Sequence, residues 1–338
     1  MTAGELSTRD TLLRMTNAFQ VSQALHVAAT LGITDLLEDG PRSADELAEA
    51  TETHPPTLYR LLRALASVGV FAELSDGRFS STALAEYLRA DAPGSVRAWA
   101  MLMGQQYVWK SWGHLLHCVT NGEPAFPKLY GTSAWEYLAA RPEEDALFNA
   151  AMTGLSAGVV EAVVQSYDFS EIGVLVDVGG GEGALLGAIL TANPGLRGIL
   201  FDQPHVVATA GALLERAGVV GRCEVVGGSF FEAVSGGANA YLLKSIVHDW
   251  DDAAAIEILR KCRAAIANNG RLLVVEPVIR PGNESDPAKF SDLNMLVMLG
   301  GRERTADDFG RLYAEAGYRL TNIIPTGSVF HIIEGAPV

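Results

Sequence analysis

The stretch Val174–Leu190, VLVDVGGGEGALLGAIL, decides how this chain of 338 residues is organised. It begins with an apolar run rich in β-branched residues, which is typical of a buried parallel strand. Four glycines lie within the five positions 179–183 and form a turn that residues with a Cβ adopt only at a cost in free energy. A helical composition follows from Ala184 onward. This order places backbone N–H groups at the edge of a sheet, where an anionic or zwitterionic ligand can bind.

The chain after this stretch continues to alternate between strands and helices. We expect strands at residues 174–178, 198–201, 223–226, 240–243, 271–275, 320–324 and 329–333. We expect helices at residues 184–191, 206–217, 252–267 and 305–316. This alternation predicts a doubly wound, Rossmann-like α/β sheet, with the last two strands as an antiparallel pair at its edge. In such a sheet, ligands bind beyond the carboxyl ends of the strands, where the strand order reverses.

The chain before this stretch has a helical pattern interrupted by one hairpin. Apolar residues at helical spacing over residues 7–30 precede a capping box at residues 43–46 and an amphipathic helix that starts at Pro55-Pro56. Asp76-Gly77 between two apolar segments is a strong hairpin signal. Two helices and a hairpin predict a winged-helix unit. We assign it to dimerisation, because a formal net charge of −15 at pH 7 argues against binding nucleic acid.

We therefore divide the chain into three parts. They are a mostly helical winged-helix dimerisation domain at residues 1–95, a helical linker and acceptor-pocket segment at 96–165, and the sheet domain at 166–338. The N-terminus lacks the pattern of a signal peptide, and no apolar run reaches the roughly 20 residues of a membrane span. Three widely spaced cysteines suggest neither a metal cluster nor a disulfide framework. We expect a cytoplasmic protein without a membrane, nucleic-acid or metal partner.

Acidic residues near two strand ends indicate which ligand the glycine turn binds. Gly179-x-Gly181-x-x-Ala184 matches a dinucleotide fingerprint loosely, and Asp202 follows at the spacing of a ribose-binding acid. Asp177, however, precedes the glycines, where a carboxylate would oppose a pyrophosphate. A carboxylate there suits a cofactor with an ammonium group. S-adenosylmethionine has one, together with a ribose diol for Asp202 and an adenine.

Further strand ends carry residues that suit the same ligand and its chemistry. The segment 226–231, VGGSFF, offers glycines and two aromatic rings for the edge and face of an adenine. The segment 242–250, LLKSIVHDW, would place Lys244 and His248 one helical turn apart. Glu276 ends a third strand with a carboxylate.

These stretches, with FDQPHV at residues 201–206 and GGRERT at 300–305, resemble the plant caffeate/flavonoid-type family of S-adenosylmethionine-dependent O-methyltransferases and its bacterial natural-product relatives. The resemblance covers essentially the whole chain and implies a homodimer that methylates a hydroxyl of an aromatic small molecule. It implies that His248 is the general base and that Glu276 and Glu303 flank it.

The resemblance and the strand ends together give the binding positions. The cofactor-binding positions are Ser156, Asp177, Gly179, Gly181, Asp202, Gly228, Ser229, Phe230 and Lys244. The acceptor-binding positions are Trp109, Phe148, Met152, Asp249 and Met295.

A histidine in this position suits the reaction as a base. A phenol has a pKa of about 10 and is mostly protonated at neutral pH, whereas histidine titrates near about 6.5. His248 can therefore take the proton as the oxygen attacks, and Glu276 or Glu303 would hydrogen-bond its other nitrogen and fix the tautomer. No metal is needed. Arg302 and Arg304, on either side of Glu303, are expected at the surface.

Three positions depart from the plant pattern. Ser229 replaces an acid, Phe230 replaces a methionine, and Ser245 replaces an aromatic residue next to the lysine. Serine can still form a hydrogen bond to adenine and phenylalanine can still stack, so we expect cofactor binding with altered contacts. Ser245 bears on the identity of the acceptor.

Three other functions stay open. Some bacterial members of the family use the cofactor in hydroxylation or decarboxylation, and a winged helix also suits a ligand-sensing regulator. The loose glycine match alone suits a nicotinamide-dependent oxidoreductase. His248, Glu276 and Glu303 favour methyl transfer. The sequence does not specify the acceptor, or whether its accepting atom is oxygen or nitrogen.

Overall fold

The computed structural model describes residues 7–338, so the six residues before them, which the sequence assigns to the first domain, lie outside the described part. The chain divides into two compact units. The first unit contains the chain up to Lys110 and residues 135–157, and the second contains residues 111–134 and 158–338. The segment 96–165, which the sequence predicts as a separate linker, is thus divided between the two units.

The first unit contains the predicted winged helix. Its elements are α1 (Thr8–Thr16), α2 (Ala18–Thr30), α3 (Ile33–Leu36), α4 (Ala44–Ala50), α5 (Pro55–Ser67), β1 (Phe71–Glu73) and β2 (Phe79–Ser81). Residues 7–30, where the spacing predicts helix, form α1 and α2, which are separate helices because Asn17 leaves helical geometry between them. Ser43 and Glu46 form the predicted capping box, and Gly77 adopts a φ of +83° in the hairpin turn. Leu47, Leu62 and Phe79 are fully buried in the core of this fold.

The chain between the hairpin and the sheet is helical. Its elements are a 3-10 helix at Ala85–Leu88 and the α-helices α6 (Arg97–Met103), α7 (Gln106–Trp112), α8 (Leu115–Asn121), α9 (Ala125–Tyr130), α10 (Ala134–Ala139) and α11 (Pro142–Ser166). By length and composition alone, α11 could cross a membrane. Its last turns place Val159 and Val163 in the hydrophobic core of the second unit.

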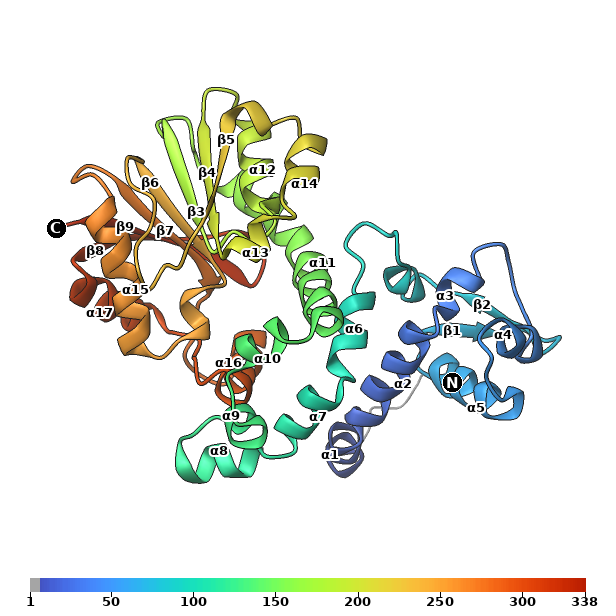
Figure 1. Cartoon of the computed structure of the whole chain (residues 1–338). Coiled ribbons are helices and arrows are strands. Elements are labelled where there is room, and N and C mark those ends of the chain that lie inside the picture. Colours follow the sequence, from blue (N-terminus) through green and yellow to red (C-terminus); the bar gives the residue numbers. More distant parts are fainter. Residues whose placement is uncertain (1–6) are drawn as a thin grey trace. The chain divides into compact units, whose positions relative to one another are not determined.

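The second unit is built on the predicted doubly wound sheet (Figure 1). Its strands are β3 (Val174–Val178), β4 (Arg197–Asp202), β5 (Cys223–Gly227), β6 (Ala240–Lys244), β7 (Arg271–Pro277), β8 (Tyr318–Pro325) and β9 (Phe330–Pro337). The strand order is β5-β4-β3-β6-β7-β9-β8. The first five strands in sequence pair in parallel, whereas β9 runs antiparallel to both β7 and β8. The predicted antiparallel edge is therefore confirmed.

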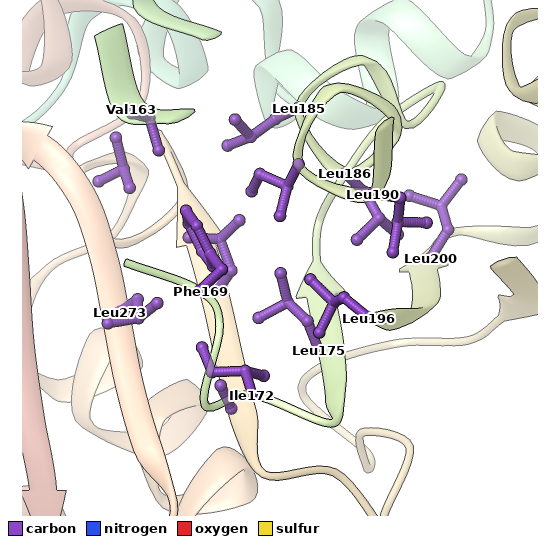
Figure 2. Close-up of a cluster of buried hydrophobic side chains, with 14 of the residues drawn as sticks. Val163, Phe169, Ile172, Leu175, Leu185, Leu186, Leu190, Leu196, Leu200 and Leu273 are labelled. Carbon is purple, nitrogen blue, oxygen red and sulfur yellow. The ribbon is translucent and has the colours of Figure 1, made fainter. Parts of the chain in front are cut away.

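Helices cover both faces of this sheet. They include α12 (Ala184–Ala192), α13 (Pro204–Val207), α14 (Gly211–Arg216), α15 (Asp252–Ala265) and α17 (Ala306–Ala316), whereas α16 (Pro287–Met298) packs on α8 and α9. On one face, Leu185, Leu186 and Leu190 of α12 pack with Leu175 and Leu200 of the sheet, as Figure 2 shows. On the other face, α15 and α17 bury the opposite side chains of the same strands.

One predicted helix is wrong in its extent. Residues 206–217 are not a single helix, because α13 ends at Val207 and α14 starts only at Gly211. The hydroxyl of Thr209 donates hydrogen bonds to the Val206 carbonyl at 2.9 Å and to Glu182 at 3.0 Å. Such side-chain bonds compete with the helical backbone pattern and interrupt it.

Candidate active site

The sequence-predicted residues of the second unit gather at the carboxyl edge of the sheet. The strand order reverses there, because β3 lies between β4 and β6. Gly179 follows β3, Asp202 ends β4, Lys244 ends β6 and Glu276 is the penultimate residue of β7. A parallel sheet leaves a crevice at such a reversal, so the topology brings these residues to the place where α/β folds bind ligands.

The glycine turn after β3 is shaped by close backbone approaches. Gly179 has a φ of +71°, a region that residues with a Cβ rarely adopt. A Cβ on Gly180 would lie 2.6 Å from Oδ2 of Asp177, so only glycine fits there. The backbone N–H groups of Gly181 and Gln203 donate to Asp202 at 2.8 and 2.6 Å. Asp202 thus ties the turn to the end of β4, and burial raises the pKa of its carboxyl group.

Asp177 lies deeper than the sequence suggests. It is the fourth residue of β3 rather than its end, is 1% exposed, and lies beneath Gly180. Burial raises the pKa of Asp177 to about 7, against the opposing effect of Lys244. Its Oδ2 has no hydrogen-bond partner within residues 7–338. A buried acceptor without a partner fits a ligand that brings hydrogen-bond donors to this turn.

The adenine side of the predicted site contains an aromatic cluster. The ring of Phe230 lies 5.1 Å from that of Phe231 and 6.2 Å from that of Trp250. A Cβ on Gly228 would lie 2.8 Å from the ring of Phe201, so this position requires glycine. Ser229 accepts a hydrogen bond from the Phe231 N–H at 3.3 Å.

Lys244 ends β6 next to a strained residue. Its Nζ lies 3.4 Å from the Ser245 hydroxyl and 5.9 Å from the centre of the Phe330 ring, and burial lowers its pKa. Ser245 has a φ of +55°, which costs a non-glycine residue about 1–3 kcal/mol. The prediction that Lys244 and His248 lie one helical turn apart is therefore wrong. Only Val247–Asp249 form a short 3-10 turn.

His248 lies in this turn among three carboxylates. Its Nδ1 lies 2.9 Å from Oε1 of Glu303, and its backbone N–H donates to Oε1 of Glu276 at 2.9 Å. Its Nε2 lies 3.4 Å from Oδ1 of Asp249. The two alternatives left by the sequence are thereby resolved, because Glu303 contacts the ring and Glu276 contacts the backbone.

The carboxylates change the protonation of this cluster. Burial alone would favour neutral imidazole, but Asp249, Glu303 and Glu276 outweigh it and raise the pKa of His248 to about 10. Burial raises the pKa of Asp249 to about 7 and also raises that of Glu276. The group is therefore a buried imidazole whose proton is held by neighbouring negative charges.

Glu303 is held by contacts that the sequence analysis did not find. Ser291 on α16 donates its hydroxyl to Oε1 of Glu303 at 2.6 Å, and the Glu303 N–H donates to Asp292 at 2.9 Å. Arg302 is exposed as expected, but the expectation for Arg304 is wrong, because this side chain is 1% exposed. The adjacent acids and arginines in the sequence do not show which of them points inward.

The predicted acceptor residues are distributed over both units. In the second unit, Asp249 adjoins His248, and Met295 is buried on α16 beside Asn294, which accepts a hydrogen bond from Trp112 at 3.0 Å. The other acceptor residues, and Ser156, belong to the first unit. There Trp109 packs against Phe19 at 6.3 Å and Phe148 against Trp135 at 5.7 Å, and Met152 and Ser156 are half-buried on α11. In the part of the chain that the structure describes, no cluster of histidine, cysteine or acidic residues could hold a metal ion.

Comparisons with known proteins agree with this architecture. A sequence profile of the O-methyltransferase domain matches residues 112–319, and one of the O-methyltransferase dimerisation domain matches residues 13–91. A phenazine O-methyltransferase from Lysobacter antibioticus is 46% identical over 99% of this chain and 98% of its own length.

Solved structures are similar over the whole chain. The structure of a mitomycin 7-O-methyltransferase is 39% identical, with a TM-score of 0.92 over 100% of both chains. An O-methyltransferase from neocarzinostatin biosynthesis, crystallised with S-adenosylmethionine and 2-hydroxy-5-methyl naphthoic acid, is 36% identical, with a TM-score of 0.82 over 94% of this chain and 96% of that chain.

The chain belongs to the O-methyltransferase family. It is an S-adenosylmethionine-dependent enzyme that methylates hydroxyl groups of aromatic small molecules and carries the dimerisation domain of that family. The glycine turn, the carboxylate of Asp202 at the end of β4 and the unpartnered buried oxygen of Asp177 fit a cofactor with a ribose diol and an ammonium group.

Proposed function

We propose that His248 is the general base of this methyltransferase and that Glu303 orients it. The contact of 2.9 Å between Nδ1 of His248 and Oε1 of Glu303 carries the proposal. With Nδ1 bound to a carboxylate, Nε2 is the nitrogen that receives a proton, and the carboxylate stabilises the imidazolium that results. Glu276 fixes the backbone of the same residue, so both glutamates limit the movement of the ring.

The residues of the site then have different roles in the reaction. S-adenosylmethionine supplies an electrophilic methyl group on a sulfonium. His248 removes the proton of the acceptor hydroxyl as the oxygen attacks, which typically contributes about 10²–10⁴-fold to the rate. The sulfonium of a bound cofactor would be a second positive charge near His248. It would help His248 to lose its own proton, because like charges oppose the imidazolium. Asp249, 3.4 Å from Nε2, is placed to accept a hydrogen bond from a second donor on the acceptor.

We infer the roles of the cofactor-binding residues from their positions at the carboxyl edge of the sheet. Asp202 would accept hydrogen bonds from the ribose diol, and Gly179 and Gly181 leave room for the methionine part. Phe230 would stack on the adenine, with Ser229 at its edge. Asp177 lies beneath the turn and would act on the ammonium group from there, directly or through water.

The acceptor that we propose is a fused aromatic natural product with a free hydroxyl group. The likeness to a phenazine O-methyltransferase over nearly the whole chain supports this class. The test is to incubate the purified protein with S-adenosylmethionine and a panel of hydroxylated phenazines, naphthoates and quinones, and to detect products by mass. A methyl ether of one class would support the proposal. A hydroxylated or decarboxylated product, or methylation at nitrogen only, would contradict it.

We further propose that the chain is a homodimer. The dimerisation domain supports this, and Leu12, Met15 and Phe19 of α1 and α2 are apolar and more than half exposed. Burial of these side chains against a second copy would remove apolar surface from water. Light scattering at micromolar concentration should give twice the mass of 35.9 kDa, and a monomer would contradict the proposal.

A further inference from the structure

We infer that Arg304 is a positioning residue, whose buried guanidinium holds the turn that carries His248. This inference rests on the proposed role of His248 as the base. Arg304 has the largest fully buried side chain in residues 7–338, yet it carries a charge. A buried guanidinium is retained in a fold only where its hydrogen bonds are satisfied.

Each of the three guanidinium nitrogens of Arg304 donates hydrogen bonds, and the partners belong to the turn or adjoin it. Nη1 donates to the carbonyl of Val247 at 2.9 Å, and Nη2 donates to the carbonyl of Trp250 at 3.0 Å. Nε and Nη2 both reach Oδ1 of Asp252, at 3.0 and 2.8 Å. Nη1 also approaches the carbonyl of Arg302 at 3.4 Å. The guanidinium thus spans the turn from the residue before His248 to the first residue of α15.

Apart from its own backbone bonds and the hydrogen bond from the His248 N–H to Glu276, the turn is held from the side of Arg304. It begins after the strained φ of Ser245 and contains only three residues of 3-10 helix. Its outer side lies against the loop that carries Arg304. A Cβ on Gly301 would lie 2.1 Å from the His248 carbonyl, and the Arg302 N–H donates to that same carbonyl at 2.9 Å. The loop therefore holds the turn through both its backbone and the Arg304 side chain.

The same loop also carries the carboxylate partner of the imidazole. Glu303 immediately precedes Arg304, and the Ile279 N–H donates to the Arg304 carbonyl at 3.0 Å, which anchors the loop beside β7. A shift of Arg304 would therefore move the turn and separate Nδ1 of His248 from Glu303 at once. Lysine cannot replace it, because an ammonium group cannot reach two carbonyls and a carboxylate in the fixed planar arrangement of a guanidinium.

The test compares Arg304→Lys with Arg222→Lys. Arg222 is a matched control, because its guanidinium also bonds backbone carbonyls, those of Leu190, Asn193 and Leu196. Both variants should melt at a lower temperature than the wild type. Only Arg304→Lys should lower kcat, by about 10- to 100-fold, since small misplacements of a catalytic group have effects of this size. Calorimetric affinity for S-adenosylhomocysteine should stay within about threefold of the wild type.

The pH profile of kcat adds a readout that a purely structural role would leave unchanged. Loosening the contact with Glu303 should lower the pKa of His248, so the rise of kcat with pH should occur at lower pH in Arg304→Lys than in Arg222→Lys. An Arg304→Lys variant with lower melting temperature but wild-type kcat and pH profile would overturn the inference.

Two further variants keep the outcome decisive. If Arg304→Lys does not fold, Asp252→Asn removes the charged partner of Arg304 at a half-exposed site, and a lower kcat with the same displaced profile is expected. His248→Ala in the same assay, with 1-hydroxyphenazine or the best acceptor of the panel, separates the two proposals. Full turnover by His248→Ala would contradict the base assignment, whereas its loss beside a normal Asp252→Asn and Arg304→Lys would contradict only the positioning role.

Discussion

Two turns at the carboxyl edge of the sheet are built in different ways. The turn after β3 takes its shape from glycines, whose backbone conformations and missing Cβ atoms let the chain fold tightly over Asp177. The turn after β6 takes its shape from side chains that reach it from residues 276 and 303–304. The first turn leaves space for a ligand, and the second holds a single imidazole in place.

This difference predicts which step each turn controls. Changes at the glycine turn should alter cofactor affinity and leave turnover of the bound enzyme nearly intact. Changes at the turn after β6, which carries His248, should lower turnover and leave cofactor affinity nearly intact. The variants below test this separation.

The largest effect is expected for His248→Ala. Turnover should fall by about 100-fold or more, because the variant lacks the base, while affinity for S-adenosylhomocysteine should stay within about threefold. Steady-state kinetics and calorimetry measure the two quantities. His54→Ala, at an exposed histidine in the first unit, is the control and should behave as the wild type. Unchanged turnover in His248→Ala would contradict the assignment.

Asp202→Ala should mainly weaken cofactor binding. The carboxylate orders Gly181 and Gln203 and would bind the ribose diol, so its loss should lower affinity about 10- to 100-fold, the value of hydrogen bonds to a charged group. Calorimetry with S-adenosylhomocysteine measures the change. Asp168→Ala removes an exposed aspartate as a control. Normal affinity in Asp202→Ala would remove this residue from the ribose site.

Glu303→Gln should lower kcat by about tenfold and shift its pH dependence. A base acts only when it is unprotonated, so kcat rises as pH passes through the pKa of His248. The charge of Glu303 helps to raise that pKa, so its removal should move the rise of kcat to lower pH. The pH profiles of kcat for the wild type and Glu303→Gln check the direction of this shift. A rise of kcat at the same pH in both proteins would count against the pairing of His248 with Glu303.

A separate effect, on stability and not on kinetics, is expected for Asp177→Asn. Burial raises the pKa of Asp177 to about 7 from 3.8, so its ionised form destabilises the fold as pH rises through this interval. Asparagine cannot ionise. The variant should therefore melt above the wild type at pH 8, with a gap that narrows toward pH 4. Scanning calorimetry at several pH values would show this, and a gap that does not depend on pH would contradict it.

The sequence predicted the parts of the fold that are specified by residues close to one another in the chain. The strand and glycine turn of Val174–Leu190, the capping box at Ser43 and the hairpin at Gly77 all carry local signals, and the structure has each of them. The prediction of a continuous helix at 206–217 was wrong, because the hydroxyl of Thr209 interrupts the helical backbone pattern.

The turn after β6, which carries His248, shows what a single sequence leaves open. The resemblance to a known family indicated His248, Glu276 and Glu303, but not which glutamate contacts the ring. That depends on contacts across 28 and 55 residues of chain. The burial of Arg304 is decided by the same packing, and two arginines around one glutamate look equally exposed in a sequence.

The most direct test of the base assignment uses two acceptors that differ in acidity. One is an aromatic hydroxyl from the panel with a pKa near about 10, and the other is a nitro-substituted analogue that is already ionised at pH 7. A base is needed only for the first. His248→Ala should therefore lose about 100-fold or more in kcat with the neutral acceptor and little with the ionised one. An equal loss with both acceptors would show that His248 does not act by removing the proton.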